Sequence, residues 1–325
     1  MQILNQISKD FEAYLSDLSF RKEPIELYDP IQYIMGIGGK RLRPAVLLLT
    51  CYLFEGKYQR GLSAALAVEI FHNFTLVHDD IMDEAPLRRG QPTVHQKYNL
   101  NTGILSGDVM LVLAYKFLTE NTPAHQLPKV LQVFNQFAVE VCEGQQMDMN
   151  FERKDKVTID EYIRMIELKT SVLVAGAMQI GALLGGAKEK EAEAMYQFGR
   201  NLGIAFQLQD DLLDTYGDPE KFGKKIGGDI AQNKKTILYL KAIERALPHQ
   251  HQQLELLYQS NRVKEQDKIK KVIEIFGELN VKDQVIELQE IYKNNAFKHL
   301  NSLDIPPERR GVMELFANNL MRREL

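Results

Sequence analysis

The chain has 325 residues, of which 45% are hydrophobic and 26% are charged, and its formal net charge is -4. A chain of this size can bury a large core, and its charge balance gives no basic field for binding nucleic acid. The two cysteines, Cys51 and Cys142, are too few for a disulfide framework and lack zinc-ligand spacing, which favours a reducing compartment.

Helical periodicity runs along the whole chain, whereas no stretch alternates convincingly with a period of two, so we predict an all-α fold. The expected helices cover residues 2–19, 44–55, 61–83, 93–119, 127–150, 159–185, 189–215 and 231–246, with shorter ones after that. Thr158 and Glu161 read as a capping box at the start of one of them. No linker or low-complexity tract interrupts the pattern, which favours a single domain over residues 1–325.

A glycine-rich turn precedes the second of these helices. In G-I-G-G-K-R-L-R-P, Lys40, Arg41 and Arg43 follow three glycines and lie at a helix start, where backbone N–H groups also favour anions. Taken alone, the same pattern fits an exposed turn.

The helix over 61–83 ends in a D-D-x-x-D motif formed by Asp79, Asp80 and Asp83. The first and last carboxylates are four residues apart and share one helix face. The surrounding stretch is largely apolar, and unpaired carboxylates there would carry a heavy desolvation cost. Two guanidiniums, those of Arg88 and Arg89, follow closely and are expected near the carboxylates.

A second D-D-x-x-D motif, Asp210, Asp211 and Asp214, lies in the helix over 189–215, again in an apolar stretch. A glycine-punctuated loop follows it and carries several charged residues: Lys224, Lys225, Asp229, Lys234 and Lys235. Such a loop is typical of a mobile lid over phosphates. Between the two motifs, Lys169 and Thr170 lie mid-helix, where an exposed lysine is the commoner arrangement.

The two carboxylate clusters together predict a metal site. A single D-D-x-x-D is as often a solvated helix face, but two of them in apolar surroundings need cations. Hard oxygen ligands suit Mg2+, which shares its shell with water and substrate phosphate. Basic residues at several places then supply donors for a diphosphate.

In order and spacing, these motifs resemble the trans-type isoprenyl diphosphate synthases, from Gly38 to Thr236. The resemblance includes G-G-K-x-x-R, D-D-x-x-D followed by R-R-G, G-Q-x-x-D at Gly144 to Asp148, K-T, F-Q-x-x-D-D-x-x-D, and finally G-K with a later K-x-T. It implies the isoprenoid synthase type I fold, a helical bundle around a central cavity with the two acid clusters across its mouth.

The resemblance also implies residue roles. The chief Mg2+ ligands are expected to be Asp79, Asp83 and Asp210, with Asp80, Asp211 and Asp214 in support, for three Mg2+ ions that bridge the allylic diphosphate. The residues expected at the allylic diphosphate are Arg88, Lys169, Gln207, Lys234 and one of Lys224 and Lys225, and Thr170 is expected to bind substrate as well. Those expected at isopentenyl diphosphate are Lys40, Arg43, His72 and Arg89, with Arg41 beside them. We expect catalysis from Asp79, Asp80, Asp83, Lys169, Thr170, Gln207 and Asp210.

The implied reaction is head-to-tail condensation. The allylic diphosphate ionises, the isopentenyl double bond attacks the carbocation, and loss of a proton leaves an all-trans chain five carbons longer. Mg2+ and cationic side chains stabilise the departing diphosphate. A dry cavity excludes water, and the dipoles of Thr170 and Gln207 are expected to stabilise the carbocation. The sequence shows no general base, so the released diphosphate is expected to take the proton.

Product length is expected to depend on side chains before the first D-D-x-x-D motif. Phe74 lies about 7.5 Å and Phe71 about 12 Å from its first aspartate along the helix axis. A helical wheel favours Phe71 as the cavity-facing ring, whereas the family resemblance favours Phe74 with the small Thr75 beside it. The resemblance suggests a fifteen- or twenty-carbon product, and two stacked rings favour fifteen. If both rings only fill the core, the floor is expected on Tyr115 or Met110.

Three other functions fit parts of the pattern. A class I terpene cyclase would need neither the second D-D-x-x-D nor Arg88 and Arg89. A catalytically silent subunit of a heteromeric prenyltransferase would not need both acid motifs. Ferritin-like metal storage would need E-x-x-H on two helices, and only Glu69 to His72 matches.

The resemblance suggests a homodimer. The N-terminus is acidic where a secretion signal would be basic, and no apolar run approaches about 18 residues. We therefore predict a cytoplasmic protein that does not span a membrane.

Overall fold

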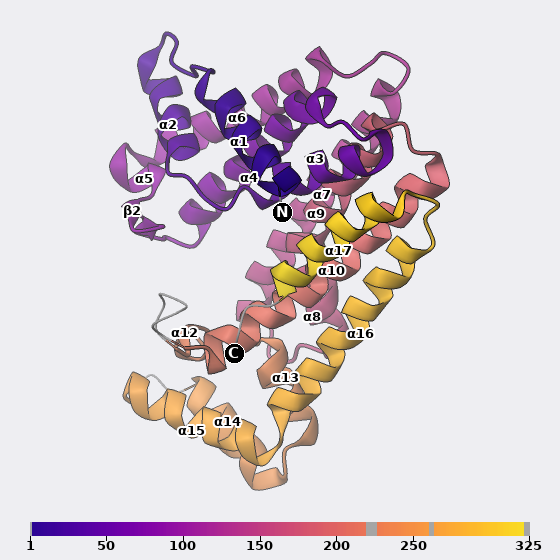
Figure 1. Ribbon diagram of the computed structural model, residues 1–325. Coiled ribbons are helices and arrows are strands. Elements are labelled where there is room, and N and C mark those ends of the chain that lie inside the picture. Colours follow the sequence, from indigo (N-terminus) through magenta and orange to yellow (C-terminus); the bar gives the residue numbers. More distant parts are fainter. Residues whose placement is uncertain (1, 219–225, 260–262, 322–325) are drawn as a thin grey trace. The chain divides into compact units, whose positions relative to one another are not determined.

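The computed structural model in Figure 1 describes residues 2–218, 226–259 and 263–321. Within these ranges the chain is helical except for turns and one short antiparallel ribbon, which confirms the all-α prediction. The ribbon joins β1 (Leu87–Arg88) to β2 (Gln91–Pro92), with Leu87 opposite Pro92. Its two-residue turn needs positive φ at both positions, which Arg89 (52°) and Gly90 (76°) supply. The R-R-G motif is therefore the tip of a hairpin.

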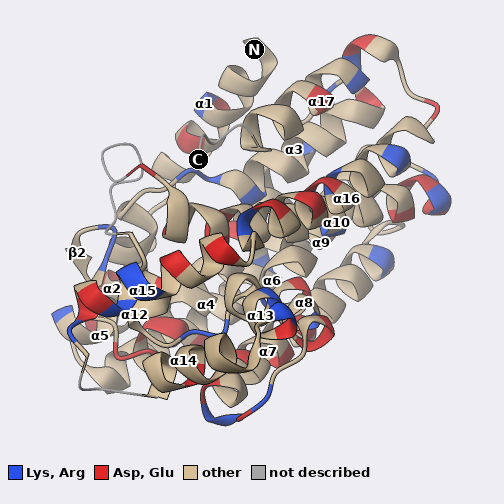
Figure 2. Ribbon diagram, turned by 90° about the horizontal axis from the view of Figure 1, so that it is seen from below, with Lys and Arg blue, Asp and Glu red and all other residues tan. Residues whose placement is uncertain are grey.

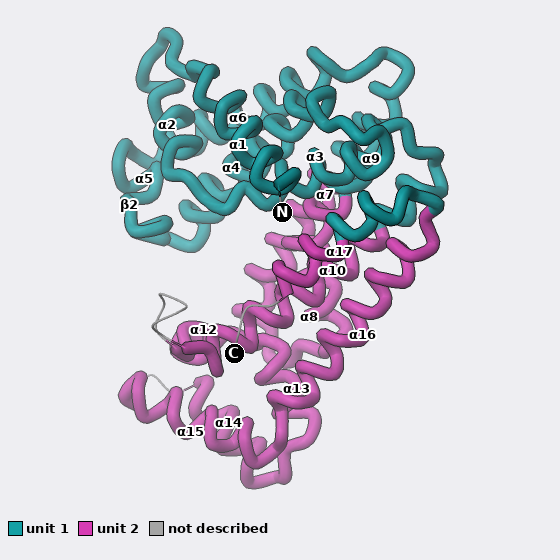
Figure 3. Tube along the Cα trace, in the orientation of Figure 1, with its two compact units in different colours: residues 1–136, 176–196, 304–313 teal, residues 137–175, 197–303, 314–325 magenta. Residues whose placement is uncertain are grey.

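The chain divides into two compact units, coloured in Figure 3. Unit 1 consists of residues 1–136, 176–196 and 304–313, and unit 2 of residues 137–175, 197–303 and 314–325. The prediction of one domain over residues 1–325 stays a prediction.

Unit 1 is organised around α4. Its helices are α1 (Gln2–Ser16), α2 (Ile25–Gly36), α3 (Leu42–Glu55), the 3-10 turn η1 (Gln59–Gly61), α4 (Leu62–Met82), α5 (Val94–Lys97) and α6 (Leu100–Glu120). The first half of α4, from Ser63 to Phe71, is buried on every face, as expected of a central helix. It packs most extensively against α6. Close approach is possible because Gly107 of α6 has no Cβ, which would lie 2.2 Å from Nε2 of His78.

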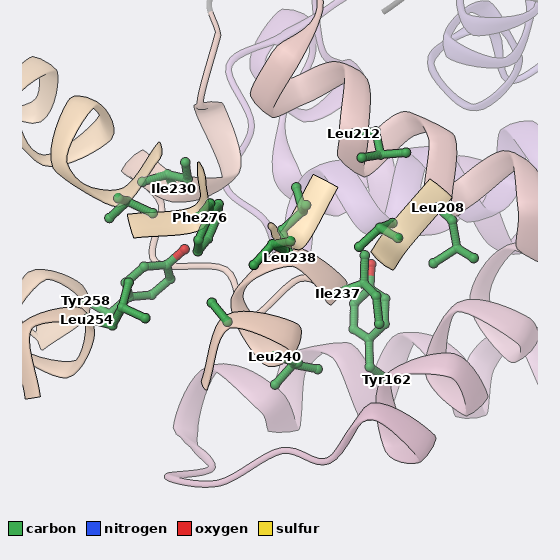
Figure 4. Close-up of a cluster of buried hydrophobic side chains, with 14 of the residues drawn as sticks. Tyr162, Leu208, Leu212, Ile230, Ile237, Leu238, Leu240, Leu254, Tyr258 and Phe276 are labelled. Atoms are coloured by element: carbon green, nitrogen blue, oxygen red, sulfur yellow. The ribbon is translucent and has the colours of Figure 1, made fainter. Parts of the chain in front are cut away.

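Unit 2 is also built from helices. Those with residues in both units are α7 (Leu127–Arg153), α9 (Val172–Leu184), α10 (Glu189–Tyr216) and α17 (Pro307–Met321). The others are α8 (Ile159–Ile166), α12 (Gly228–Ala231), α13 (Ile237–Arg245), α14 (Pro248–Gln259), α15 (Glu265–Glu278) and α16 (Val281–Asn301). Figure 4 shows a core of this unit, where Leu208 and Leu212 of α10 belong to the same buried cluster as Ile237 of α13 and Phe276 of α15.

Several helix boundaries differ from the predicted ones. The helix expected over 93–119 breaks into α5 and α6, because the side chain of Asn99 accepts the N–H of Thr102 at 2.8 Å and caps a new helix. The helix expected over 231–246 is α13 alone, since Asn233 has φ of 59° between α12 and α13. The sequence also missed α2, because Pro30 inside it reads as a helix breaker.

The expected capping box is confirmed. Oγ1 of Thr158 accepts the N–H of Glu161 at 3.2 Å, and Oε2 of Glu161 accepts the N–H of Thr158 at 2.9 Å. The same helix continues without a break through a π-helical turn, Glu167–Ser171, into α9.

Two helical stretches are long and apolar enough to pass a membrane-span test of length and composition, contrary to the expectation that no apolar run approaches that length. The stretch Ile159–Leu184 is 78% buried, as for a core helix, whereas α6 is 33% buried. Burial in a core therefore does not explain the apolar residues of α6.

Basic and acidic residues are interspersed along the ribbon in Figure 2, in keeping with the near-neutral charge balance. The two cysteines are not bonded to each other: Cys51 is buried in α3, and Cys142 is exposed on α7.

Candidate active site

In unit 1, the G-G-K-R turn and the R-R-G hairpin meet. Gly38 and Gly39 have φ of 81° and 145°, values that side chains other than glycine rarely adopt. A Cβ on Gly39 would lie 2.4 Å from Nη1 of Arg89, so the glycine leaves room for that guanidinium over the turn. Lys40 is exposed at the end of the turn. Two of the basic motifs predicted for one substrate are thus neighbours.

Arg41 differs from its neighbours because its guanidinium is occupied by protein acceptors. It donates to Oε1 of Glu69 at 2.7 Å and to the carbonyl of Met35 at 2.6 Å, and its side chain is 8% exposed. A third contact reaches Glu12 at 3.3 Å. Arg41 also has φ of 45° and directly precedes α3, where its side chain makes no capping hydrogen bond. These contacts fit an anchor for the turn better than a direct substrate contact.

His72 on α4 lies beside Arg43, with 3.0 Å between Nε2 and Nη1. Because a guanidinium can only donate, Nε2 is the acceptor and the neutral ring carries its proton on Nδ1. Burial, followed by the charges of Arg43 and Arg89, holds the pKa of His72 well below its usual range. Burial lowers the pKa of Arg43 to about 10, which leaves the guanidinium charged at neutral pH.

The three carboxylates of the first acid motif have different surroundings. Asp80 is 1% exposed and accepts two bonds from Arg88, from Nε at 2.8 Å and Nη2 at 2.7 Å. Asp79 is half-buried, and Asp83, at the C-terminal end of α4, is exposed. The motif therefore has one carboxylate that orients an arginine and two on the more accessible side.

The aromatic residues before this motif form a row of edge-to-face and tilted ring contacts. The ring of Phe74 lies 4.9 Å from that of His78 and 5.6 Å from that of Phe71, whose ring lies 5.4 Å from that of Phe134. Phe71 is 1% exposed, whereas Phe74 is half-buried. Thr75 is also half-buried, and its hydroxyl donates to the carbonyl of His72 at 2.8 Å. The alternative residues belong to α6: Met110 is buried, and the ring of Tyr115 meets that of Phe134 edge-to-face, with 4.9 Å between the ring centroids.

In unit 2, the G-Q-x-x-D and K-T motifs come together at the π-helical turn. A Cβ on Gly144 would lie 2.2 Å from the backbone nitrogen of Lys169, so only glycine allows α7 to approach the turn this closely. Nζ of Lys169 donates to Asp148. Gln145 is 7% exposed, and neither amide atom of its side chain has a partner among the described residues. The sequence reading assigned Gln145 no role.

Glu167 anchors the same turn and was also missed. It is 6% exposed and pairs with Arg164 of α8 at 2.7 Å and with Arg200 of α10 at 2.7 Å. Two guanidiniums compensate the negative charge of this buried carboxylate. The linear sequence does not show which residues form these pairs.

The second acid motif is tied into its surroundings. The hydroxyl of Tyr162 donates to Asp211, and Nε2 of Gln207 lies 3.3 Å from its other oxygen. Burial raises the pKa of Asp211 to about 8. Asp214 accepts the N–H of Asp229 at 3.0 Å, which joins the motif to the segment after it. Asp210 is half-buried.

The two lysines of K-K-T have separate roles. Lys234 is 57% exposed and lies 3.5 Å from a carboxylate oxygen of Asp229. Lys235 donates to the carbonyls of Phe151, at 3.1 Å, and Lys154, at the end of α7. A cation is favourable at that end of a helix. The predicted contacts of Lys224 and Lys225 lie outside the described residues.

The carboxylates suit Mg2+ by type. Within the described residues, no group of three or more potential ligands is assembled for a metal ion. Mg2+ needs no such cage, because it commonly binds through one or two carboxylates, with water and substrate phosphate completing its shell. The hard oxygen donors of both motifs fit that mode of binding.

Comparisons with known proteins place these motifs in context. Residues 24–276 match the family described as polyprenyl synthetase. A geranylgeranyl diphosphate synthase of Methanosarcina mazei is 45% identical over 242 residues, 74% of each chain. A geranylgeranyl pyrophosphate synthase of Geoglobus acetivorans is 36% identical over 99% of both chains. A solved geranylgeranyl pyrophosphate synthase, 44% identical and with 99% of both chains covered, superposes with a TM-score of 0.93.

Proposed function

Because this chain belongs to the polyprenyl synthetase family and is a prenyltransferase, we propose that it condenses isopentenyl diphosphate with allylic diphosphates to a twenty-carbon product. The observation that carries this proposal is the similarity of the whole chain to geranylgeranyl diphosphate synthases, together with both complete acid motifs. The two phenylalanines favoured fifteen carbons. The names of the relatives favour twenty, and one relative with 38% identity, from Natronomonas pharaonis, is a geranylfarnesyl diphosphate synthase.

The isopentenyl diphosphate site would use the basic residues of unit 1. Lys40 is exposed, and Arg89 lies over the same turn. Arg43 stays charged beside a neutral His72, which can donate from Nδ1 without adding a second charge. Two guanidiniums and an ammonium match the charge of a diphosphate.

The allylic diphosphate site would use Arg88, Lys169, Gln207 and Lys234. Asp80 aims the guanidinium of Arg88, and Asp148 holds the ammonium of Lys169. Positioned donors of this kind stabilise negative charge as it develops on the leaving diphosphate. Asp79, Asp83 and Asp210, with Asp80, Asp211 and Asp214 in support, would hold Mg2+, whose charge would make diphosphate a good leaving group.

Condensation then requires that the carbocation be protected from water. Thr170 lies in the π-helical turn, where the changed backbone hydrogen bonding can turn a carbonyl away from the helix axis. The carbonyl and hydroxyl of Thr170 would stabilise the cation. The carbocation formed by condensation loses a proton to give the new double bond. The released diphosphate takes this proton, so no protein base is needed.

We also propose a cytoplasmic homodimer that uses the outer face of α6. Four apolar residues of this helix are exposed, Leu100 by 52%, Ile104 by 40%, Leu105 by 57% and Val112 by 67%. Exposed apolar residues grouped on one helix are typical of a protein contact surface. A second copy of the chain would cover it and account for a helix that is apolar yet 33% buried.

The test is incubation of the purified protein with Mg2+, labelled isopentenyl diphosphate and, separately, the five-, ten- and fifteen-carbon allylic diphosphates. Chromatography should show a twenty-carbon product from each primer. A fifteen-carbon product with the fifteen-carbon primer unused would keep the reaction and contradict the product length. Conversion of an allylic diphosphate without isopentenyl diphosphate would favour a terpene cyclase, and no product from any primer would favour a silent subunit.

A further inference from the structure

The segment from Gly227 to Thr236 joins the second acid motif to Lys234 through backbone hydrogen bonds. The N–H of Gly227 donates to the carbonyl of Asp214 at 2.7 Å, and the N–H of Asp229 donates to its carboxylate at 3.0 Å. The N–H of Lys234 returns to the carbonyl of Asp229 at 2.9 Å. The segment therefore sets the position of two carboxylates and one exposed ammonium together.

A buried lysine of α15 braces this segment from the other side. Lys268 is 4% exposed. Its Nζ donates to the carbonyl of Ala231 at 3.3 Å and to Oδ1 of Asn233, and it lies 5.2 Å from the ring centroid of Tyr258. Burial lowers the pKa of Lys268, as expected when an ammonium leaves water. Without these partners, a buried lysine would be strongly unfavourable.

The contact at Asn233 fixes an unusual backbone turn. Asn233 has φ of 59°, a conformation that costs free energy for most residues and less for asparagine. The bond from Lys268 to its side chain holds this turn, and Lys234 is the next residue. Ile269, the neighbour of Lys268, closes over Gly227, where a Cβ would lie 2.7 Å from its Cγ2.

The base of the segment is apolar and packed. Figure 4 shows Ile230 of α12 beside Phe276 of α15 and Tyr258 of α14, and all three belong to one buried cluster. Hydrophobic contacts therefore hold the middle of the segment, and Lys268 provides the polar contacts at its exit toward Lys234.

We propose that Lys268 is a positioning residue for diphosphate binding: it holds the Asn233 turn so that Lys234 and Asp229 keep a fixed place beside Asp214. This inference rests on the proposed function, in which Lys234 and the second acid motif bind the allylic diphosphate. Lys268 is buried and engaged by Ala231 and Asn233, so it acts through Lys234.

The first test compares Lys268→Met with Lys271→Met, a control at an exposed lysine of the same helix. Lys268→Met should raise the KM for the allylic diphosphate by about tenfold, the usual effect of removing a supporting contact, with the KM for isopentenyl diphosphate unchanged. Calorimetry with inorganic diphosphate and Mg2+ should show the same loss of affinity. Lys271→Met should match the unchanged protein in both measurements.

A double-mutant cycle tests whether Lys268 influences diphosphate binding through Lys234. If Lys268 acts through Lys234, Lys268→Met should raise the KM for the allylic diphosphate much less in a Lys234→Met protein than in the wild type. The effects of coupled residues are not additive. Additive losses would overturn the proposal. So would a fall in melting temperature with both KM values and the diphosphate affinity unchanged, since that marks a purely structural role.

A second variant serves if Lys268→Met does not fold. Asn233→Gly keeps the positive φ and removes the acceptor of the Lys268 bond, and it should also weaken diphosphate binding selectively. Unchanged affinity in Asn233→Gly would contradict the inference. A wild-type protein that binds diphosphate with Mg2+ but condenses no substrates would instead contradict the proposed function, so the two failures are distinguishable.

Discussion

His72 shows how the surroundings of one residue set its chemistry. Four arginines act on its ring, Arg43, Arg89, Arg88 and Arg41 in decreasing order, and Arg43 lies within hydrogen-bond distance. Glu69, one turn earlier on the same helix, is paired with Arg41. A positive charge on the ring would therefore be unfavourable even before any substrate binds.

This arrangement predicts a pH dependence of stability. The pKa of His72 is depressed in the folded protein and near 6.5 in the unfolded chain. Below about pH 6.5 the unfolded state gains a proton that the folded state does not, so the free energy of unfolding falls as the pH decreases. In His72→Gln this slope should lessen by up to about 1.4 kcal/mol per pH unit, measured by urea unfolding between pH 5 and 7. An identical slope in both proteins would show that His72 is charged in the fold.

Asp80 is expected to matter for stability as well as for catalysis. Asp80→Ala leaves Arg88 without its two bonds in a partly buried position and should lower the free energy of unfolding by about 3 kcal/mol. Asp83→Ala changes an exposed carboxylate of the same motif and should cost less than about 0.5 kcal/mol. Denaturant unfolding of both variants checks the difference. Equal losses would mean that the Asp80–Arg88 pair contributes little to stability.

Phe74 is the better candidate for the floor of the product site. Phe71 is buried against Phe134, although a helical wheel favoured it, whereas Phe74 is partly accessible. Phe74→Ala should lengthen the main product by at least one five-carbon unit, read by chromatography. Phe71→Ala should mainly reduce stability, by about 3 kcal/mol, as for a core aromatic. Unchanged product length in Phe74→Ala would move the floor to another residue.

At the scale of elements, the π-helical turn depends on a glycine in another helix. The backbone of Lys169 occupies the space that a side chain on Gly144 would need, and backbone cannot move aside as a flexible side chain can. The placement of the K-T motif is therefore determined by α7 as well as by its own helix.

Gly144→Ala should therefore displace the turn and lower kcat by about a hundredfold, the effect of misplacing a reacting group by about 1 Å. Gly277→Ala is a suitable control, since nothing lies within 4 Å of the added Cβ. That control should retain activity. The measurement is steady-state kinetics with circular dichroism to verify helicity, and normal turnover in Gly144→Ala would show that the turn tolerates displacement.

The same scale explains what could be predicted from the sequence. Elements with local signals were found: Thr158 and Glu161 mark a helix start three residues apart, and both acid motifs show in a single stretch. The π-helical turn has the composition of an ordinary helix, so periodicity gives no sign of it.

Long-range partners could not be predicted for the same reason. Arg41 and Glu69 are 28 residues apart, and Lys268 and Asn233 are 35 apart. Each residue alone reads as an ordinary charged or polar position of a solvated surface. The residues of the motifs could therefore be predicted from the sequence, whereas the residues that position them could not.

At the scale of the whole molecule, the exposed apolar residues of α6 form the contact surface of the proposed homodimer. Val112→Asp should shift the protein from dimer to monomer in sedimentation velocity, because a carboxylate would be buried in the proposed contact. Leu256→Asp changes an apolar residue of α14 that is 60% exposed, and the dimer should persist. A monomeric wild-type protein would contradict the proposed dimer.

The two thiols differ in reactivity, so the protein can be labelled selectively at one cysteine. Burial raises the pKa of Cys51 to about 12, so at neutral pH almost none of it is the reactive thiolate, whereas Cys142 is exposed. A maleimide fluorophore would therefore attach at Cys142 alone, without any mutation. The label would then sit two residues from Gly144, on the helix that sets the K-T turn, in the unmodified sequence.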